Sequence, residues 1–218
     1  AVPTTDEIAQ QFIAHYQPIV DLNTGAVAGF EALARVVESD GSIVTAGAII
    51  EAIEQRPDTL KALIRTILAS IRHDMVELFE QRQKFYVSVN ITPAILGSGQ
   101  VLQLIEELKL KPYLNRIMCE VTERQALTAV GRSALELARQ SGVRIAIDDF
   151  GTGHSGLMQI VGLNFDLLKI DHSLIETILT NHTAARMLRG IVALAAALRL
   201  RTVAEGVENW EEAFFLRA

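Results

Sequence analysis

Short apolar runs alternate with longer amphipathic segments over most of the chain. The short runs hold four to eight residues, are rich in β-branched and aromatic side chains, and end at glycine, proline or polar residues. This is the pattern of buried strands. Seven strands are predicted, at His15–Leu22, Val27–Leu33, Phe85–Asn90, Ile117–Val121, Val143–Ile147, Phe165–Ile170 and Arg201–Ala204.

Between the strands, apolar residues recur every three or four positions, as on one face of a helix. The predicted helices are Ala46–Glu54, Asp58–Gln81 with Asp58 as its cap, Gln100–Leu108, Ala126–Gln140, a short helix after Ser155, Ser173–Leu198, and a last helix capped by Asn209. The turn Asn23-Thr24-Gly25 joins the first two strands within a few residues, so these two strands should be antiparallel.

Alternating strands and helices predict an α/β fold with a mainly parallel sheet covered by helices. A modified (β/α)8 TIM-like barrel with an antiparallel first strand fits best. A closed barrel needs eight strands, so the last βα unit is expected to be missing from these 218 residues. A doubly wound open sheet is the alternative, but its glycine-rich phosphate turn is absent. We expect a leader or linker over 1–13 and one domain, incomplete at its C-terminus, over 14–218.

Composition and charge exclude several classes of protein. Half of the residues are hydrophobic, the net charge is −6, and Lys and Arg form no run, so no DNA or RNA polymer and no direct membrane contact is expected. Cys119 is the single cysteine, which excludes an intrachain disulfide and fits a buried thiol. A cytoplasmic location is expected, including as the cytoplasmic part of a membrane-anchored protein.

Polar residues close six consecutive predicted strands. They are Glu31, Asn90, Glu120, Asp148 with Asp149, Lys169 and Glu205. Asp148 and Asp149 alone would equally suit a turn, but the carboxyl ends of barrel strands converge on one site. Five carboxylates against one lysine are untenable in a partly buried pocket unless cations bind there. Hard oxygen ligands favour Mg²⁺ or Mn²⁺, two per site, with Ca²⁺ as a non-productive occupant.

Short motifs around these residues resemble the EAL domain family, in the family's order. They are Tyr16-Gln17-Pro18-Ile19-Val20, Glu31-Ala32-Leu33, Val89-Asn90-Ile91, Glu120-Val121-Thr122-Glu123, Asp148-Asp149-Phe150-Gly151-Thr152-Gly153, Lys169-Ile170-Asp171 and Ala204-Glu205-Gly206-Val207-Glu208. The resemblance implies a bacterial signalling enzyme. Such an enzyme hydrolyses cyclic di-GMP to linear 5′-pGpG with water activated by two Mg²⁺ or Mn²⁺ ions, and Ca²⁺ is expected to inhibit it.

The resemblance also implies residue roles. The metal ligands would be Glu31, Asn90, Glu120, Asp148 and Asp149, the catalytic residues Glu205 and Lys169, the substrate contacts Gln17, Leu33, Arg35 and Glu208, and the loop-stabilising residue Glu123. Glu208 is equally well read as part of the first turn of the last helix, and Asp171 is better read as a helix cap than as a substrate contact.

The expected partners are cyclic di-GMP, a second copy joined through the loop after Asp149, and a sensory or other signalling domain in the full-length protein. The sequence departs from the family in that loop, where His154 replaces Tyr and Gly156 replaces Ser, and it lacks the family's eighth strand with its Gln-Gly motif. A catalytically silent cyclic di-GMP receptor is the alternative. Such receptors lose acidic ligands, which this chain retains.

Overall fold

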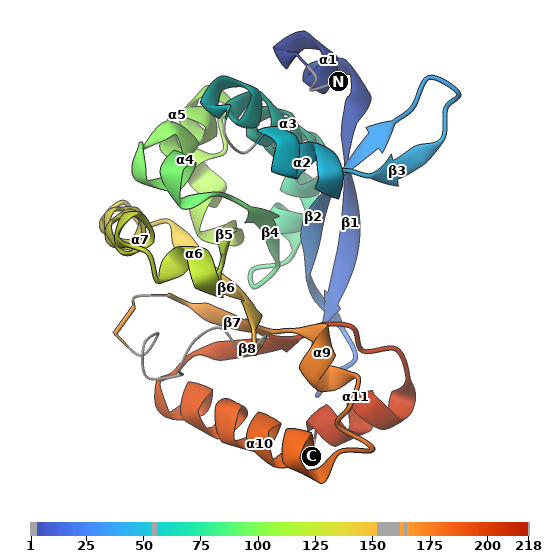
Figure 1. Ribbon diagram of the computed structural model, residues 1–218. Coiled ribbons are helices and arrows are strands. Elements are labelled where there is room, and N and C mark those ends of the chain that lie inside the picture. Colours follow the sequence, from blue (N-terminus) through green and yellow to red (C-terminus); the bar gives the residue numbers. More distant parts are fainter. Residues whose placement is uncertain (1–3, 54–55, 152–161, 164, 218) are drawn as a thin grey trace.

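The computed structural model describes residues 4–53, 56–151, 162–163 and 165–217. Its strands form one mixed sheet in the order β1-β2-β4-β5-β6-β7-β8, with β3 paired to β2. Figure 1 shows this sheet curling, with helices on its outer side. The strands are β1 (Phe12–Val20), β2 (Val27–Val37), β3 (Ile43–Thr45), β4 (Tyr86–Asn90), β5 (Ile117–Thr122), β6 (Arg144–Phe150), β7 (Leu167–Ile170) and β8 (Arg201–Ala204).

The pairing confirms the predicted barrel type. β1 is antiparallel to β2, and from β2 through β4 to β8 each ladder is parallel. The strand path begins at β1 and ends at β8, and in the described part of the chain no ladder joins these two edges. The sheet is therefore a TIM-like half-barrel. All seven predicted strands are present. β3 was missed because its three residues are exposed and show no alternation.

The helices differ from the prediction mainly at their breaks. The described helices are α1 (Thr5–Gln11), α2 (Gly47–Ile53), α3 (Pro57–Gln81), α4 (Pro93–Gly97), α5 (Gln100–Glu107), the 3-10 helix η1 (Lys111–Arg116), α6 (Glu123–Ala126), α7 (Ala129–Gln140), α9 (His172–Ile175), α10 (His182–Ala197) and α11 (Trp210–Arg217). The short helix predicted after Ser155 lies outside the described residues.

Side-chain caps explain two of these breaks. Thr128 accepts a hydrogen bond from the Gly131 amide and starts α7, which separates it from α6. Asn181 accepts from two amides and starts α10, so the single helix predicted over Ser173–Leu198 was wrong. Asp58 does not cap α3 either. That helix begins with Pro57, whose ring presets a helical φ, and Asp58 lies in its first turn.

The core lies between the outer face of the sheet and the helices. The predicted stripe of α3 is buried, with Leu63, Ile67 and Ile71 each at most 5% exposed. Burying such a side chain contributes about 1.5–3 kcal/mol. A second, smaller cluster of Tyr86, Met118, Ala146 and Leu167 is formed by neighbouring strands. These four residues come from β4, β5, β6 and β7 and fill the concave side of the sheet below the polar residues.

Among the helices that the structure describes, none combines the length and the apolar character needed to cross a bilayer.

Candidate functional site

The parallel register brings the predicted polar residues to one end of the half-barrel. Asn90 pairs with Glu120, Thr122 with Asp148, and Lys169 with Val203. Because the side chains of a strand alternate between its faces, these positions point to the concave side. The prediction that Glu31 closes its strand is wrong. Glu31 lies in the middle of β2, which continues to Val37 because its second half pairs with β1 and β3.

The ammonium of Lys169 contacts four carboxylates at this end of the sheet. Its Nζ lies 2.8 Å from Glu120 Oε2, 3.0 Å from Asp148 Oδ1, 3.1 Å from Glu31 Oε2 and 2.7 Å from Glu205 Oε1. The Lys169 side chain is 2% exposed. Four carboxylates from four strands or strand ends therefore converge on one buried cation, as the strand-end pattern predicted.

The electrostatics of this cluster leave an excess of negative charge. Burial alone would lower the pKa of the Lys169 ammonium, but the four carboxylates outweigh it and raise that pKa above its usual range. Burial raises the pKa of Glu120 to about 8, with Glu31 and Asp148 adding to the rise and Lys169 opposing it. Burial likewise raises the pKa of Glu205 to about 7. One ammonium therefore does not neutralise the cluster.

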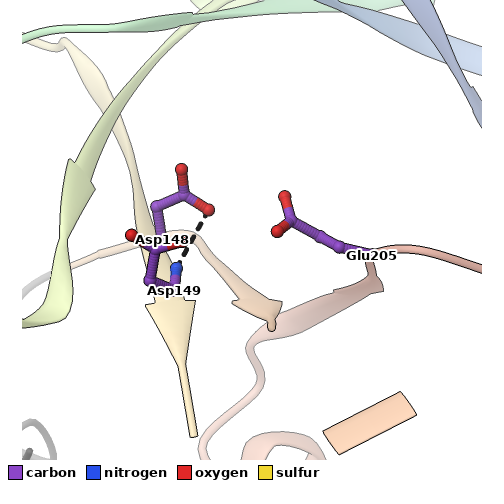
Figure 2. Close-up of side chains that lie close together, drawn as sticks. All are labelled: Asp148, Asp149 and Glu205. Atoms are coloured by element: carbon purple, nitrogen blue, oxygen red, sulfur yellow. Dashed lines mark hydrogen bonds between the residues drawn. The ribbon is translucent and has the colours of Figure 1, made fainter. Parts of the chain in front are cut away.

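The donor set fits a divalent metal ion. Asp148, Asp149 and Glu205 each offer one carboxylate oxygen within 4.8 Å of the others. Figure 2 shows Asp148 and Glu205 directing their carboxylates into the same space. In the described part of the chain, Glu120 Oε1 is buried without a hydrogen-bond partner. Hard oxygen donors with uncompensated negative charge suit Mg²⁺, Mn²⁺ or Ca²⁺.

A local backbone distortion lets both aspartates take part. In a regular strand Asp148 and Asp149 would face opposite sides of the sheet. Asp149 instead has φ +56, and the register between β6 and β7 shifts between Ile147 and Phe150. The Asp149 amide donates to Asp148 Oδ1 at 3.0 Å, which fixes that carboxylate (Figure 2). Burial and the neighbouring Asp148 raise the pKa of the Asp149 carboxyl group.

The predicted ligand Asn90 and the substrate contacts lie around this cluster. Asn90 Nδ2 donates to Glu31 Oε1 at 3.3 Å. Gln17 is the cross-strand partner of Glu31 on β1, so the two share a face. Leu33 and Arg35 follow Glu31 at alternate positions of β2 and lie on that face too. Their contact with a substrate stays a prediction.

The residues predicted at the rim have structural contacts. Asp171 caps α9, as expected, because its carboxylate accepts from the Ser173 amide at 3.0 Å. Asn209 accepts from the Glu212 amide at 2.8 Å, which confirms the predicted cap. The Glu208 amide donates to Glu212 Oε2 at 2.8 Å, and the Glu208 carboxylate is not among the four that contact Lys169. A ligand role for Glu208 stays a prediction.

Glu123 begins α6 and is only 2% exposed. Its Oε1 is buried and has no hydrogen-bond partner among the residues that the structure describes. The loop that it is predicted to stabilise, including His154 and Gly156, lies outside them. Its role therefore stays a prediction.

Two residues near the site were not singled out by sequence reasoning. Ser88 is 1% exposed and pairs in register with Glu31 on the concave side. Its polar side chain, at an inward-facing position of the predicted strand Phe85–Asn90, is the feature of the sequence that indicates a place near the site. Gly206 follows Glu205 with φ +67, and a Cβ built there would lie 2.6 Å from the Cβ of His172. No sequence pattern reveals such a contact between distant segments.

Proteins of known sequence resemble this chain over most of its length. A relative from Escherichia coli (strain K12), described as the probable cyclic di-GMP phosphodiesterase PdeB, is 32% identical over 206 residues. The match covers 93% of this chain but only 39% of PdeB, so the chain spans about two fifths of that relative.

Solved structures share the fold. The EAL enzyme Bd1971, in its form bound to cAMP and cyclic di-GMP, has a TM-score of 0.82 at 30% identity, covering 98% of this chain and 61% of that one. BlrP1 from Klebsiella pneumoniae, in a calcium and cyclic di-GMP complex, has a TM-score of 0.81 at 26% identity, covering all of this chain and 54% of that one.

The match to the family extends along nearly the whole chain. Residues 5–218 match the EAL domain. This confirms the resemblance carried by the strand-end motifs, whereas the division of the chain at residue 14 stays a prediction. By its sequence and its fold, the chain belongs to the EAL domain family.

Proposed function

We propose that this domain hydrolyses one phosphodiester bond of cyclic di-GMP to give linear 5′-pGpG, in a reaction that requires Mg²⁺ or Mn²⁺. The observation that carries the proposal is the convergence of Glu31, Glu120, Asp148 and Glu205 on the buried ammonium of Lys169. Four carboxylates around one buried ammonium form the kind of strongly perturbed charge cluster that is typical of catalytic sites. Related chains described as probable cyclic di-GMP phosphodiesterases support the choice of substrate.

In this proposal, Glu31, Asn90, Glu120, Asp148 and Asp149 hold two divalent ions. When bound, the ions supply positive charge that lowers the pKa of a coordinated water and offsets charge on the phosphoryl oxygens. Calcium is expected to bind here without supporting turnover. That BlrP1 was solved with calcium and cyclic di-GMP together is consistent with this expectation.

The remaining residues would handle the proton and the substrate. Glu205, with its pKa raised to about 7, can accept a proton near neutral pH. Lys169, 2.7 Å away, would hold that carboxylate in place and orient the attacking water. Arg35 offers a guanidinium fork for a phosphate oxygen on the same face of β2 as Glu31, and Gln17 an amide beside it.

Several assignments extend beyond the described residues. A homodimer through the loop after Asp149, a sensory or other signalling domain in the full-length protein, and a cytoplasmic location remain part of the proposal. Longer relatives support the second of these, since PdeB is much longer than this chain.

The test is a turnover assay on the purified domain. Cyclic di-GMP is incubated with Mg²⁺ or Mn²⁺, and the products are separated by chromatography. We expect pGpG with either metal, none with a chelator, and at least a hundredfold slower turnover in Glu205→Gln. Glu106→Gln is the matched control, because Glu106 pairs with Lys111 on the surface. Tight binding of cyclic di-GMP without product would instead establish a receptor.

A further inference from the structure

The amino end of the half-barrel carries positive charge, opposite in sign to the acidic cluster. Arg144 is the first residue of β6 and Arg201 the first residue of β8. Arg144 precedes Ala146 and Asp148 at alternate positions, so it points to the same concave side. Arg201 pairs with Leu167, two residues before Lys169, and therefore points to that side too.

The Arg201 guanidinium is held by a ring rather than by an acid. Its Cζ lies 5.1 Å from the centroid of the Tyr86 ring, which is almost fully buried. Such cation–π contact orients the guanidinium plane. In the part of the chain that the structure describes, the Arg201 side chain makes no hydrogen bond or ion pair. Its N–H donors are thus oriented and open to a ligand.

The hydrogen-bond donors of the Arg144 guanidinium have only long, weak contacts. Its Nε lies 3.5 Å from Asp166 Oδ1, and its Nη1 lies 3.5 Å from the Asn115 carbonyl oxygen, both at the outer limit of hydrogen bonding. Asp166 also accepts from the Ile145 amide through Oδ2 at 2.9 Å. One carboxylate is therefore shared between the Arg144 guanidinium and a backbone amide. Burial and the charge of Arg144 both lower the pKa of Arg201, which indicates that the two positive charges repel each other.

An apolar layer separates these arginines from the acidic cluster. Met118, Ala146 and Leu167, together with the Tyr86 ring, occupy the concave side between the two ends of the strands. A ligand held by the arginines would therefore not occupy the space of the carboxylates around Lys169. A phosphate group suits the arginine end, because its three terminal oxygens can accept from two guanidinium forks at once.

We propose that Arg144 and Arg201, backed by the ring of Tyr86, form a binding site for the phosphate group of a small phosphorylated molecule. The site lies at the end of the half-barrel opposite the acidic cluster and does not depend on the proposed hydrolysis. Free inorganic phosphate and an organic phosphate monoester share the chemistry that the two arginines would recognise.

The experiment measures the melting temperature as sodium phosphate replaces sodium chloride at constant ionic strength, with a chelator present to remove divalent ions. We expect a saturable rise in wild type, because a ligand of the folded state alone stabilises it by mass action. The apparent affinity should fall at least tenfold in Arg201→Gln and in Arg144→Gln. Arg201→Lys should weaken it several-fold, since lysine keeps the charge but not the fork.

Arg186→Gln is the matched control, because Arg186 is exposed on α10, and it should respond as wild type. Each variant is compared with itself in chloride, so a lower intrinsic stability does not obscure the result.

Repeating the titration with guanosine 5′-monophosphate and with guanosine distinguishes an organic phosphate ligand from free phosphate. Tighter binding of the monoester indicates an organic ligand, and equal binding indicates recognition of phosphate alone. No phosphate-specific rise in wild type, or an equal rise in Arg201→Gln, would overturn the proposal.

Discussion

Lys169 Nζ lies 2.8 Å from Glu120 Oε2, and the two side chains are only 2% and 1% exposed. An ammonium buried this deeply needs compensating carboxylates, because a buried charge without a partner is strongly destabilising. The same ammonium also contacts Glu31, Asp148 and Glu205. Lys169 is therefore the internal counter-charge of the site as well as its proposed water-orienting group.

Replacing Lys169 by methionine should destabilise the metal-free domain. The substitution leaves four carboxylates around an apolar side chain, and we expect a loss of about 3–5 kcal/mol in the free energy of unfolding. Urea unfolding followed by circular dichroism measures this loss. Mg²⁺ should restore part of it, because a divalent ion replaces the missing positive charge.

Lys111→Met is the control for that change. Lys111 pairs with Glu106 at 3.1 Å, but the two side chains are 72% and 71% exposed. Surface pairs of this kind contribute little, so the variant should unfold nearly as wild type does. Similar losses in the two variants would mean that Lys169 has no special electrostatic role.

The metal-free domain should lose stability as the pH rises from about 5 to about 8. Folding raises the pKa of Glu205 from 4.5 to about 7 and that of Glu120 from 4.5 to about 8, chiefly by burial. Between those values the folded chain binds more protons than the unfolded chain, so the free energy of unfolding falls with pH. The raised pKa of Lys169 contributes constant stability over this range, which lies below its usual value.

Urea titrations at several pH values with a chelator measure this slope. Glu205→Gln should flatten it, because the amide does not titrate. Added Mg²⁺ should stabilise wild type more at pH 8 than at pH 5, since metal binding requires deprotonated ligands. Parallel profiles for wild type and Glu205→Gln would contradict the assigned origin of the slope.

Gly206→Ala should impair turnover by moving Glu205. The new Cβ would lie 2.6 Å from the Cβ of His172, a distance that the backbone must relieve. The adjacent Glu205 amide donates to the Ile170 carbonyl at 3.0 Å, so movement here shifts the carboxylate that contacts Lys169. We expect at least a tenfold fall in kcat, measured by pGpG formation.

A double variant separates the contact from backbone strain. Gly206 has φ +67, so alanine also costs about 1 kcal/mol there. Gly142→Ala has the same kind of strain at φ +76 but nothing within 4 Å, and it should leave kcat unchanged. His172→Gly removes the opposing Cβ and should recover much of the activity in the Gly206→Ala background. Failure of this rescue would assign the defect to strain alone.

Cys119 should be chemically silent in the folded domain. It is 1% exposed, and burial raises its thiol pKa to about 12. Iodoacetamide at pH 8 should therefore label no cysteine in the native protein and one in urea, as counted by mass spectrometry. Native labelling at a rate comparable to that in urea would show that the β5 core opens readily.

The sequence predicted the positions of seven strands, because these follow from local periodicity, and it predicted polar residues at the carboxyl ends of most of them. It did not show that one ammonium contacts four carboxylates, since that contact depends on β2, β5, β6 and the end of β8 curling toward β7. The positive φ of Asp149 was also hidden, because an Asp-Asp pair fits either a turn or a strand.

The errors have similar causes. The break between α9 and α10 was missed because Asn181 interrupts an otherwise continuous helical pattern. Arg144 and Arg201 were read as ordinary strand residues, and only the register places both on the concave side. Non-local pairing decides these features, and local sequence propensity does not reveal such pairing.

A single-turnover assay that follows binding and cleavage of cyclic di-GMP in the same samples tests the proposed hydrolysis most directly. Wild type and Glu205→Gln are each mixed with the ligand in Ca²⁺ and then transferred to Mg²⁺. We expect both proteins to bind in Ca²⁺, and only wild type to convert the ligand to pGpG after the change of metal. Wild type that binds cyclic di-GMP yet forms no pGpG with Mg²⁺ or Mn²⁺ would contradict the proposal.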